Sequence, residues 1–504
     1  MEVWSDEPKK NKTTTTRPRN DRLEAESKVG PNSEKIKSDV FHTLAPIYHM
    51  SKIFGLLPVK FTKDSGGRYR GRLQGSQIIY GIVVLLGYMG AQCYGLYRDL
   101  RNGWQNSTRL SSETAITVTC SDVLAVISVV TSAIIGSSFR WRHLQAALNM
   151  IVDVDEKLGI MTSKNLRRGS IIVISCTFVY LVTISLLDYI SWSYSFDKKN
   201  VQVYDDKGPI NYSPIYFMYI VIMTFEMQYA LVLFNVGERF LKLNKTIENL
   251  TKTNLIIEYF RKDMGLTAPS DPRKNLFQAI SFVSSDIGHS RLRRTNKVSD
   301  FIVSSEGNGG TSEAIDQLIT LHGTLCDCII RINKAYGGTI LIGTISCLIH
   351  LIITPYFLYN EIYLDNSSNW YVLALQVFWI IFHVYRLLLF VQPCYMVSVK
   401  AKITGALVSQ ALAQNWDPKA KKQLEIFSLQ LLHRPVEFTA CGLFFLDRGL
   451  VTSIVGAVTT YLVILVQFQN ADDTKGTKHL LQNATELLKN ASSFKNISVF
   501  KNTS

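Results

Sequence analysis

The chain has 504 residues, 54 Lys+Arg against 40 Asp+Glu, a formal net charge of +14 and a mean hydropathy of +0.10. A positive mean with so many charges requires long apolar runs set apart from charged segments, which excludes a string of soluble domains. Aromatic residues make up 11% of the chain, which excludes disorder, and eight cysteines are too few for a disulfide scaffold.

The apolar runs predict seven membrane-spanning helices. A bilayer core about 30 Å thick needs roughly 20 apolar helical residues. The runs do not alternate in hydrophobicity, as the strands of a membrane β-barrel would. We therefore expect an all-α membrane protein with seven transmembrane helices. The seven runs are 77–97, 115–136, 170–194, 213–236, 337–359, 370–397 and 449–468.

The segments between these runs complete the predicted organisation. The N-terminal residues are polar and predict a disordered tail. The largest polar segment combines helical stretches with a flexible linker at 304–313, and Asp417-Pro418 marks the start of a helix over 416–432. In chain order we expect a tail (1–40), a lead-in with helices one to four (41–236), a helical loop (237–336), helices five and six (337–397), a helical anchor segment (398–448), the seventh helix (449–468) and a C-terminal tail (469–504).

The distribution of basic residues predicts the orientation. With seven spans the other segments fall into two alternating sets, and the set that includes the N-terminus holds 42 Lys+Arg against 11 in the other. Positive charge accumulates on the cytoplasmic side, so we expect a cytoplasmic N-terminus and an extracellular C-terminus. Seven glycosylation sequons fall on the predicted outside, at Asn106, Asn211, Asn366, Asn483, Asn490, Asn496 and Asn502. This orientation argues against a G-protein-coupled receptor.

Several function classes find no support in the sequence. It contains no phosphate-binding loop, nucleophile elbow or paired-carboxylate motif, so we expect neither an enzyme nor ATP-driven transport. The cysteines have no zinc spacing, and we expect no metal and no cofactor. The net charge is explained by topology and by contact with anionic lipid, and no motif indicates nucleic-acid binding.

Ionisable residues inside the spans are the first functional candidates, because such groups are costly in a membrane and usually face a cavity or a partner. They are Asp122, Asp188, Glu226, His350, His383 and Arg386. One interpretation is a set of structural ion pairs, which suits Arg386 with an acidic neighbour. The other is a water-filled pocket, which we favour for Asp122 and His350. Aromatic Tyr356 and Trp379 would cover the C–H surfaces of a small ligand there, either a polyol or a cation.

The seventh span differs from the others in its many small and hydroxylated residues. Tyr461, Ile464 and Phe468 share one helical face, with Gln467 beside them. If this face lines a pore, Phe468 and Ile464 would constrict it and Gln467 would offer an amide dipole to a passing cation. A single helix encloses no pore, so several copies would surround one axis. The alternative is a helix that faces lipid or packs within the bundle.

The end of this span resembles the insect gustatory receptor family. Thr460-Tyr461, five hydrophobic residues and Gln467-Phe468 are similar to the motif that closes those receptors. The resemblance implies a ligand-gated, nonselective cation channel, a homotetramer in the plasma membrane of sensory neurons, formed alone or with related subunits. It implies that the seventh helix lines the pore, with Phe468 and Ile464 as the gate, and that each subunit holds a tastant pocket in its outer half. Membrane lipid and permeant cations are its other partners.

Two further stretches are most similar to the fructose-receptor branch. They run over 346–358 and 378–394, and the resemblance implies a sugar ligand with Asp122 and Trp379 at the pocket. We add His350, Tyr356 and His383 as candidate ligand contacts. The segment 438–442 also occurs in branches linked to bitter compounds, which keeps a bitter ligand open. A proton-coupled transporter that relays protons through Asp122, Glu226 and His350 is the alternative from another class.

Overall fold

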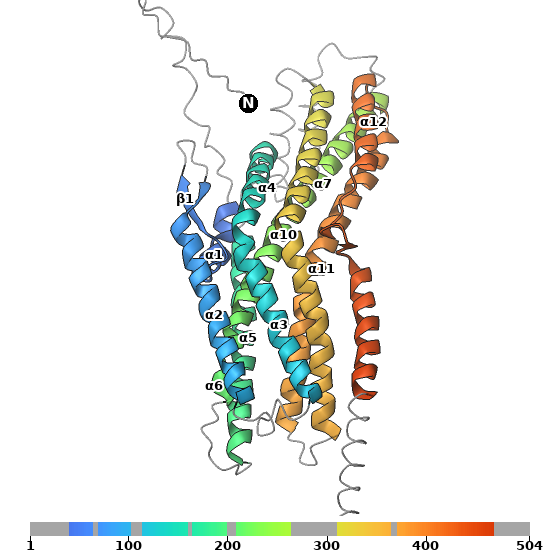
Figure 1. Cartoon of the computed structure of the whole chain (residues 1–504). Coiled ribbons are helices and arrows are strands. Elements are labelled where there is room, and N and C mark those ends of the chain that lie inside the picture. The colour runs from blue at the N-terminus through green and yellow to red at the C-terminus, as the bar shows by residue number, and fades with distance from the viewer. Residues whose placement is uncertain are drawn as a thin grey trace, which may run out of the picture. The chain divides into compact units, whose positions relative to one another are not determined.

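The computed structural model describes residues 40–63, 69–101, 113–159, 164–198, 208–263, 310–363 and 370–467, all within one compact unit, Lys37–Ser504. The predicted tails lie outside the described residues, apart from Val40 at the start of the first helix. Figure 1 shows the elements, most of them helices. They are α1 (Val40–Ile53), β1 (Val59–Lys63), β2 (Tyr69–Leu73), α2 (Gly75–Arg101), α3 (Glu113–Ile135), α4 (Ser137–Leu158), α5 (Lys164–Lys198), α6 (Gly208–Tyr212), α7 (Pro214–Asp263), α10 (Gly310–Tyr363), α11 (Trp370–Leu412), α12 (Pro418–His433), β3 (Thr439–Ala440), β4 (Phe444–Phe445) and a final helix, Arg448–Gln467.

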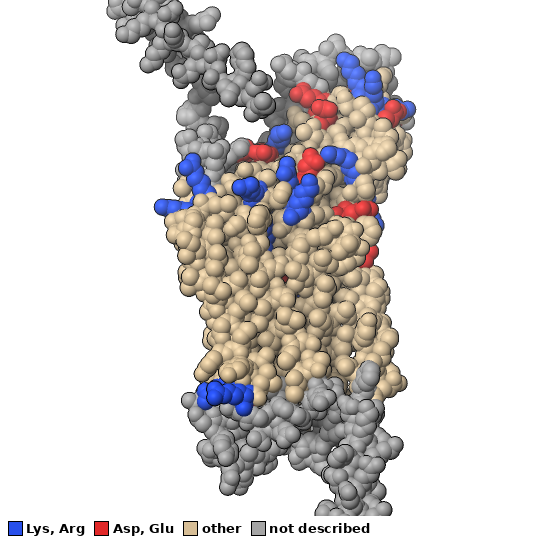
Figure 2. Space-filling model, in the orientation of Figure 1, with Lys and Arg blue, Asp and Glu red and all other residues tan. Residues whose placement is uncertain are grey.

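Seven of the helices are long and apolar enough to cross a membrane, which confirms the seven predicted spans. Three of them, α7, α10 and α11, have 50, 54 and 43 residues, and a span needs only about 20. They therefore continue past the membrane. Figure 2 shows most of the visible charged side chains near the end of the bundle where α4 and α12 lie, above a broad band without them. We call this the charged end. The seven helices are Gly75–Arg101, Ile116–Ile135, Leu166–Ser193, Pro209–Tyr259, Gly310–Tyr359, Trp370–Leu412 and Arg448–Gln467.

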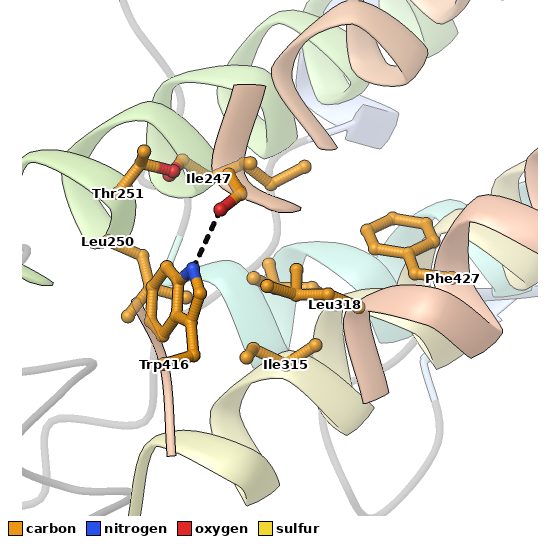
Figure 3. A pocket seen from close by; sticks show the side chains of 9 residues that line it. Ile247, Leu250, Thr251, Ile315, Leu318, Trp416 and Phe427 are labelled. Carbon is orange, nitrogen blue, oxygen red and sulfur yellow. Dashed lines mark hydrogen bonds between the residues drawn. The ribbon is translucent and has the colours of Figure 1, made fainter. Parts of the chain in front are cut away.

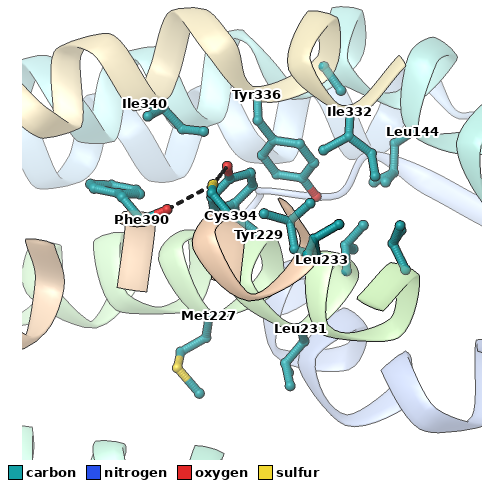
Figure 4. Packing of buried hydrophobic residues seen from close by; sticks show 14 of the residues in the cluster. Leu144, Met227, Tyr229, Leu231, Leu233, Ile332, Tyr336, Ile340, Phe390 and Cys394 are labelled. Carbon is teal, nitrogen blue, oxygen red and sulfur yellow. Dashed lines mark hydrogen bonds between the residues drawn. The ribbon is translucent and has the colours of Figure 1, made fainter. Parts of the chain in front are cut away.

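Helix α7 forms the centre of the bundle and is buried on nearly all sides over its first 30 residues. Its Tyr229 ring lies 5.2 Å from that of Tyr336 on α10. The Tyr229 hydroxyl pairs with Cys394 Sγ on α11 at 2.9 Å, as Figure 4 shows. One tyrosine thus joins three helices through ring packing and a satisfied hydroxyl, which a buried polar group requires.

The lead-in segment contains a helix and a hairpin that were not predicted from the sequence. Strands β1 and β2 pair antiparallel, with Val59 opposite Leu73. Trp141 of α4 donates its Nε1 hydrogen to the Gly71 carbonyl at 2.9 Å. A Cβ at Gly71 would lie 2.2 Å from the Trp141 ring, so only glycine allows this approach. The hairpin is therefore anchored on α4.

At the charged end the predicted start of α12 is confirmed, whereas the predicted linker before α10 is partly wrong. Asp417 caps α12, and its Oδ1 accepts a hydrogen bond from the Ala420 amide at 2.8 Å. The predicted linker at 304–313 is wrong over its last four residues, because α10 begins at Gly310 with Glu313 in its first turn, where an acidic side chain favours a helix.

Figure 3 shows a small apolar hollow between α7, α10, α11 and α12. It lies beside Trp416, whose Nε1 donates a hydrogen bond to the Ala411 carbonyl at 2.7 Å.

Candidate functional site

A carboxylate and a histidine from two spanning helices meet inside the bundle. His350 Nε2 of α10 lies 3.1 Å from Asp122 Oδ1 of α3, within ion-pair distance although not aligned as a hydrogen bond. Tyr212 of α6 donates its hydroxyl hydrogen to the other carboxylate oxygen at 2.9 Å. The His350 side chain is 1% exposed and that of Asp122 is 16% exposed. Asp122 is therefore the member of the pair that an incoming ligand would reach.

Aromatic rings surround this pair in a continuous stack. The His350 and His383 rings are 4.6 Å apart, and His383 stacks on Trp379 at 6.0 Å. Tyr219 of α7 contacts these three rings at centroid distances of 5.4–5.9 Å. The structure thus brings together four predicted ligand contacts, Asp122, His350, Trp379 and His383. We call these four with Tyr212 and Tyr219 the polar–aromatic cluster.

A buried ion pair lies next to the cluster. Arg386 Nη2 is 2.9 Å from Glu226 Oε1, and both side chains are fully buried. Arg386 Nη1 lies 3.5 Å from His383 Nδ1, and its guanidinium carbon lies 5.8 Å from the Tyr219 ring centroid. The pair joins α7 to α11 and holds two cluster rings in place. The structural interpretation of Arg386 with an acidic neighbour is confirmed.

Asp188 of α5 also supports the cluster from outside. Its carboxylate accepts a hydrogen bond from the Tyr216 hydroxyl, and the Tyr216 ring stacks on Trp379 with centroids 6.3 Å apart. Asp188 therefore fixes a ring that covers one face of Trp379. This role is structural.

Tyr356 lies in a different place from the other predicted ligand residues. Its fully buried side chain packs with Val118 of α3 and Ile353 of α10, beside Leu462 and Leu465 of the final helix. This cluster connects the final helix to the two helices that carry Asp122 and His350.

Three tyrosines that complete the site are not among the predicted residues. Tyr212, Tyr216 and Tyr219 stand at positions i, i+4 and i+7 at the start of the fourth apolar run. Side chains at that spacing share a helical face, so the pattern itself was a signal for an aromatic stripe facing one partner.

The final helix is exposed over most of its surface and packs through few side chains. Ile454 is buried against Leu351, Leu387 and Val391 of α10 and α11. Further along the helix Tyr461, Ile464 and Gln467 are exposed, and we call these three residues the open face. Phe468, the other predicted gate residue, lies outside the described residues.

The predicted glycosylation site at Asn211 finds little room in the structure. Its side chain is buried, and its Nδ2 donates to Asp99 Oδ1 of α2 at 2.7 Å. Helix α2 passes so closely that a Cβ at Gly95 would lie 2.1 Å from the Asn211 carbonyl oxygen. This geometry argues against a glycan on Asn211. The other six sequon asparagines, at 106, 366, 483, 490, 496 and 502, lie outside the described residues.

Seven spanning helices around a buried polar–aromatic cluster define a multi-pass membrane protein with a candidate site for a small ligand. Residues 44–472 match the family described as 7tm Chemosensory receptor. The chain therefore belongs to the chemosensory receptor family, which confirms the resemblance carried by its last motif.

Individual relatives support the same assignment. The chain is 26% identical over 438 residues to the Gustatory receptor for sugar taste 43a of Drosophila melanogaster, covering 84% of this chain and 98% of that protein. It is 21% identical over 525 residues to the Gustatory receptor for bitter taste 66a of the same species, covering 90% and 94%. The olfactory receptor OR5 of Machilis hrabei, solved in complex with eugenol, shares the fold with a TM-score of 0.53 at 14% identity, covering 86% of this chain and all of that one.

Proposed function

We propose that the protein is a gustatory receptor that works as a ligand-gated, nonselective cation channel, with the polar–aromatic cluster as its tastant site. The observation that carries the proposal is the partly exposed Asp122 carboxylate among stacked rings. Rings cover the C–H faces of a sugar, and a carboxylate accepts its hydroxyl hydrogens. The similarity to a sugar receptor favours a sugar such as fructose, and a bitter compound is the alternative.

The proposed orientation places the charged end in the cytoplasm. Basic residues favour that side of a membrane, and the visible charged side chains concentrate there. The polar–aromatic cluster would then lie in the extracellular half of the bundle, within reach of a tastant. The N-terminus would be cytoplasmic, the C-terminus would be extracellular, and the receptor would act in the plasma membrane of sensory neurons.

We place the pore on the open face of the final helix. Four copies around one axis would bring together four sets of Tyr461, Ile464 and Gln467, all exposed in the single chain. Apolar Ile464, with Phe468 next along the axis, would close the pore by excluding water, and the Gln467 amide would face the permeant cation.

Two helices connect the site to the pore. Helix α3 carries Asp122 in the site and Val118 four residues away in the apolar cluster that adjoins Leu462. Helix α10 likewise carries His350 in the site and Tyr356 in that apolar cluster. A ligand that separates Asp122 from His350 would displace both helices against the final helix. It opens the channel only if it binds the open arrangement more tightly than the closed one.

Whole-cell current tests the proposal. Cells that express only this chain are perfused with fructose, other sugars and a panel of bitter compounds, and we expect a rapid cation current to a sugar. Asp122→Asn and Trp379→Ala should abolish or strongly weaken the response. Trp370→Ala is the matched control, because Trp370 is exposed at the start of α11. A current only to bitter compounds would reject the sugar ligand, and silence with surface expression confirmed would count against a self-sufficient channel.

A proton-coupled transporter is the second candidate, because titratable groups form a chain through the bundle. Asp122 adjoins His350, His350 stacks on His383, and His383 adjoins the Arg386–Glu226 pair. Phe468→Ala separates the two functions. A channel should conduct without ligand once its gate is truncated, whereas a transporter should show no constitutive current.

A further inference from the structure

We propose that Arg140 forms part of a buried anion site suited to a halide such as chloride. Arg140 lies in the first turn of α4 and is 3% exposed. Its Nη2 donates to the Ala133 carbonyl at 2.9 Å and to the Leu56 carbonyl at 3.3 Å. Its Nη1 is buried with no hydrogen-bond partner, and no carboxylate of the described residues pairs with it. A buried charge of this kind needs a compensating charge.

Two tyrosine hydroxyls, one beside Arg140 and one on the next tyrosine, are also buried without a partner among the described residues. They belong to Tyr336 of α10 and Tyr48 of α1. The Arg140 guanidinium carbon lies 5.6 Å from the Tyr336 ring centroid, and Tyr336 interacts electrostatically with both Arg140 and Tyr48. In Figure 4 the Tyr336 hydroxyl points away from the paired Tyr229 hydroxyl and Cys394. The unpartnered groups thus come from three elements around one region.

The chemistry of this group favours an anion. The free groups are a guanidinium N–H and two phenol O–H, all able to donate. Burial lowers the pKa of Arg140 to about 10, which leaves it protonated at neutral pH. The Phe225 ring, 4.9 Å from the guanidinium carbon, offers it only a weak counter-charge. Water would satisfy the hydrogen bonds and leave only the partial charges of the Ala133 and Leu56 carbonyls to balance the guanidinium, whereas a small monovalent anion supplies a full counter-charge. Bound there, it would stabilise the contact between α1, α4, α7 and α10.

Thermal unfolding of the full-length protein in detergent tests the site without any use of channel activity. Chloride or bromide is titrated against gluconate at constant ionic strength, and the melting temperature should rise with halide until the site saturates. Arg140→Gln should remove the halide dependence. Tyr336→Phe keeps the ring contacts and removes one donor to the anion, so the half-saturating chloride concentration should rise about tenfold.

Other tyrosine-to-phenylalanine variants serve as the control and as a second test of the anion site. Tyr229→Phe removes a hydroxyl that already pairs with Cys394, so it should leave the half-saturating concentration unchanged. If Arg140→Gln does not fold, Tyr336→Phe and Tyr48→Phe decide the question. A melting temperature that does not change with halide concentration would overturn the site. So would a half-saturating chloride concentration that is unchanged in both phenylalanine variants. Neither result bears on the tastant current, so this proposal and the proposed function fail separately.

Discussion

The buried charges of this protein differ in how each is compensated. Arg239 of α7 forms a bidentate ion pair with Asp155 of α4, with Nε 2.9 Å from Oδ1 and Nη2 2.7 Å from Oδ2. Arg386 likewise pairs with Glu226. These two pairs hold helices together and are closed to ligands. Asp122 differs because its partners leave part of the carboxylate accessible. Burial alone therefore does not mark a binding residue, and the remaining access to Asp122 is the reason why we propose it as one.

Glu226→Gln should strongly destabilise the protein. The substitution leaves the Arg386 charge buried and unpaired, at a cost of about 3–5 kcal/mol. Thermal unfolding in detergent and surface expression both measure the loss. Glu248→Gln is the control, because Glu248 and Lys252 form an exposed pair in which one substitution costs under about 1 kcal/mol. Equal losses in the two variants would contradict the structural role of the buried pair.

At the scale of elements, apolar length was enough to predict every spanning helix, because a membrane imposes that length on the sequence. Asp417-Pro418 likewise predicted the start of α12, since capping is local chemistry. The β1–β2 hairpin was not predictable in this way, because its position depends on contact with Trp141, distant in sequence.

The candidate site was predictable in its polar members for a similar reason. Charged groups inside a membrane are costly, so Asp122 and His350 stood out from the sequence alone. Tyr356 was harder to assign, because an aromatic residue fits a pocket and a packed core equally well. Tyr356 lies six residues after His350, a rotation of about 600° around the helix axis. The two side chains therefore point about 120° apart. Helical spacing alone thus indicates that Tyr356 and His350 face different surroundings.

Tyr356→Ala should uncouple the tastant site from the pore. The substitution removes the only ring of the three-residue apolar cluster (Val118, Ile353, Tyr356) against which Leu462 and Leu465 pack, and it leaves Asp122 and His350 in contact. We expect the maximal current per surface-expressed channel to fall about tenfold, for a coupling free energy of about 1.4 kcal/mol. Tyr356→Phe keeps the ring and should conduct normally. An unchanged maximal current with a shifted half-maximal concentration would instead make Tyr356 a ligand contact.

Asp417→Ala should weaken α12 and its packing at the charged end. The variant removes the carboxylate that accepts the Ala420 amide hydrogen, at a cost of about 1 kcal/mol. Asp417→Asn keeps a capping oxygen and should retain most of the stability. The free energy of unfolding in detergent compares the two, and equal stability of the alanine and asparagine variants would show that the cap contributes nothing.

At the scale of the whole molecule, the final helix is less covered than the helices around it. Its packed face meets α10 and α11 through Ile454, while Tyr461, Ile464 and Gln467 remain exposed. Lipid would satisfy the isoleucine but not the Gln467 amide, because an unpaired polar group in hydrocarbon is costly. We propose that several copies surround a water-filled axis, in which water hydrates Gln467 and the Ile464 side chains face one another.

Cysteine substitution should show which face of the final helix meets water. With ligand present, a charged methanethiosulfonate reagent should block the current through Ile464→Cys, because the open pore admits the reagent to that face. Ile454→Cys should resist it, since the Ile454 side chain is buried against α10 and α11. The unsubstituted chain controls for its own exposed thiols, Cys93, Cys176 and Cys441. Resistance at both positions in the open state would mean that lipid or protein covers the Ile464 face and that the pore lies elsewhere.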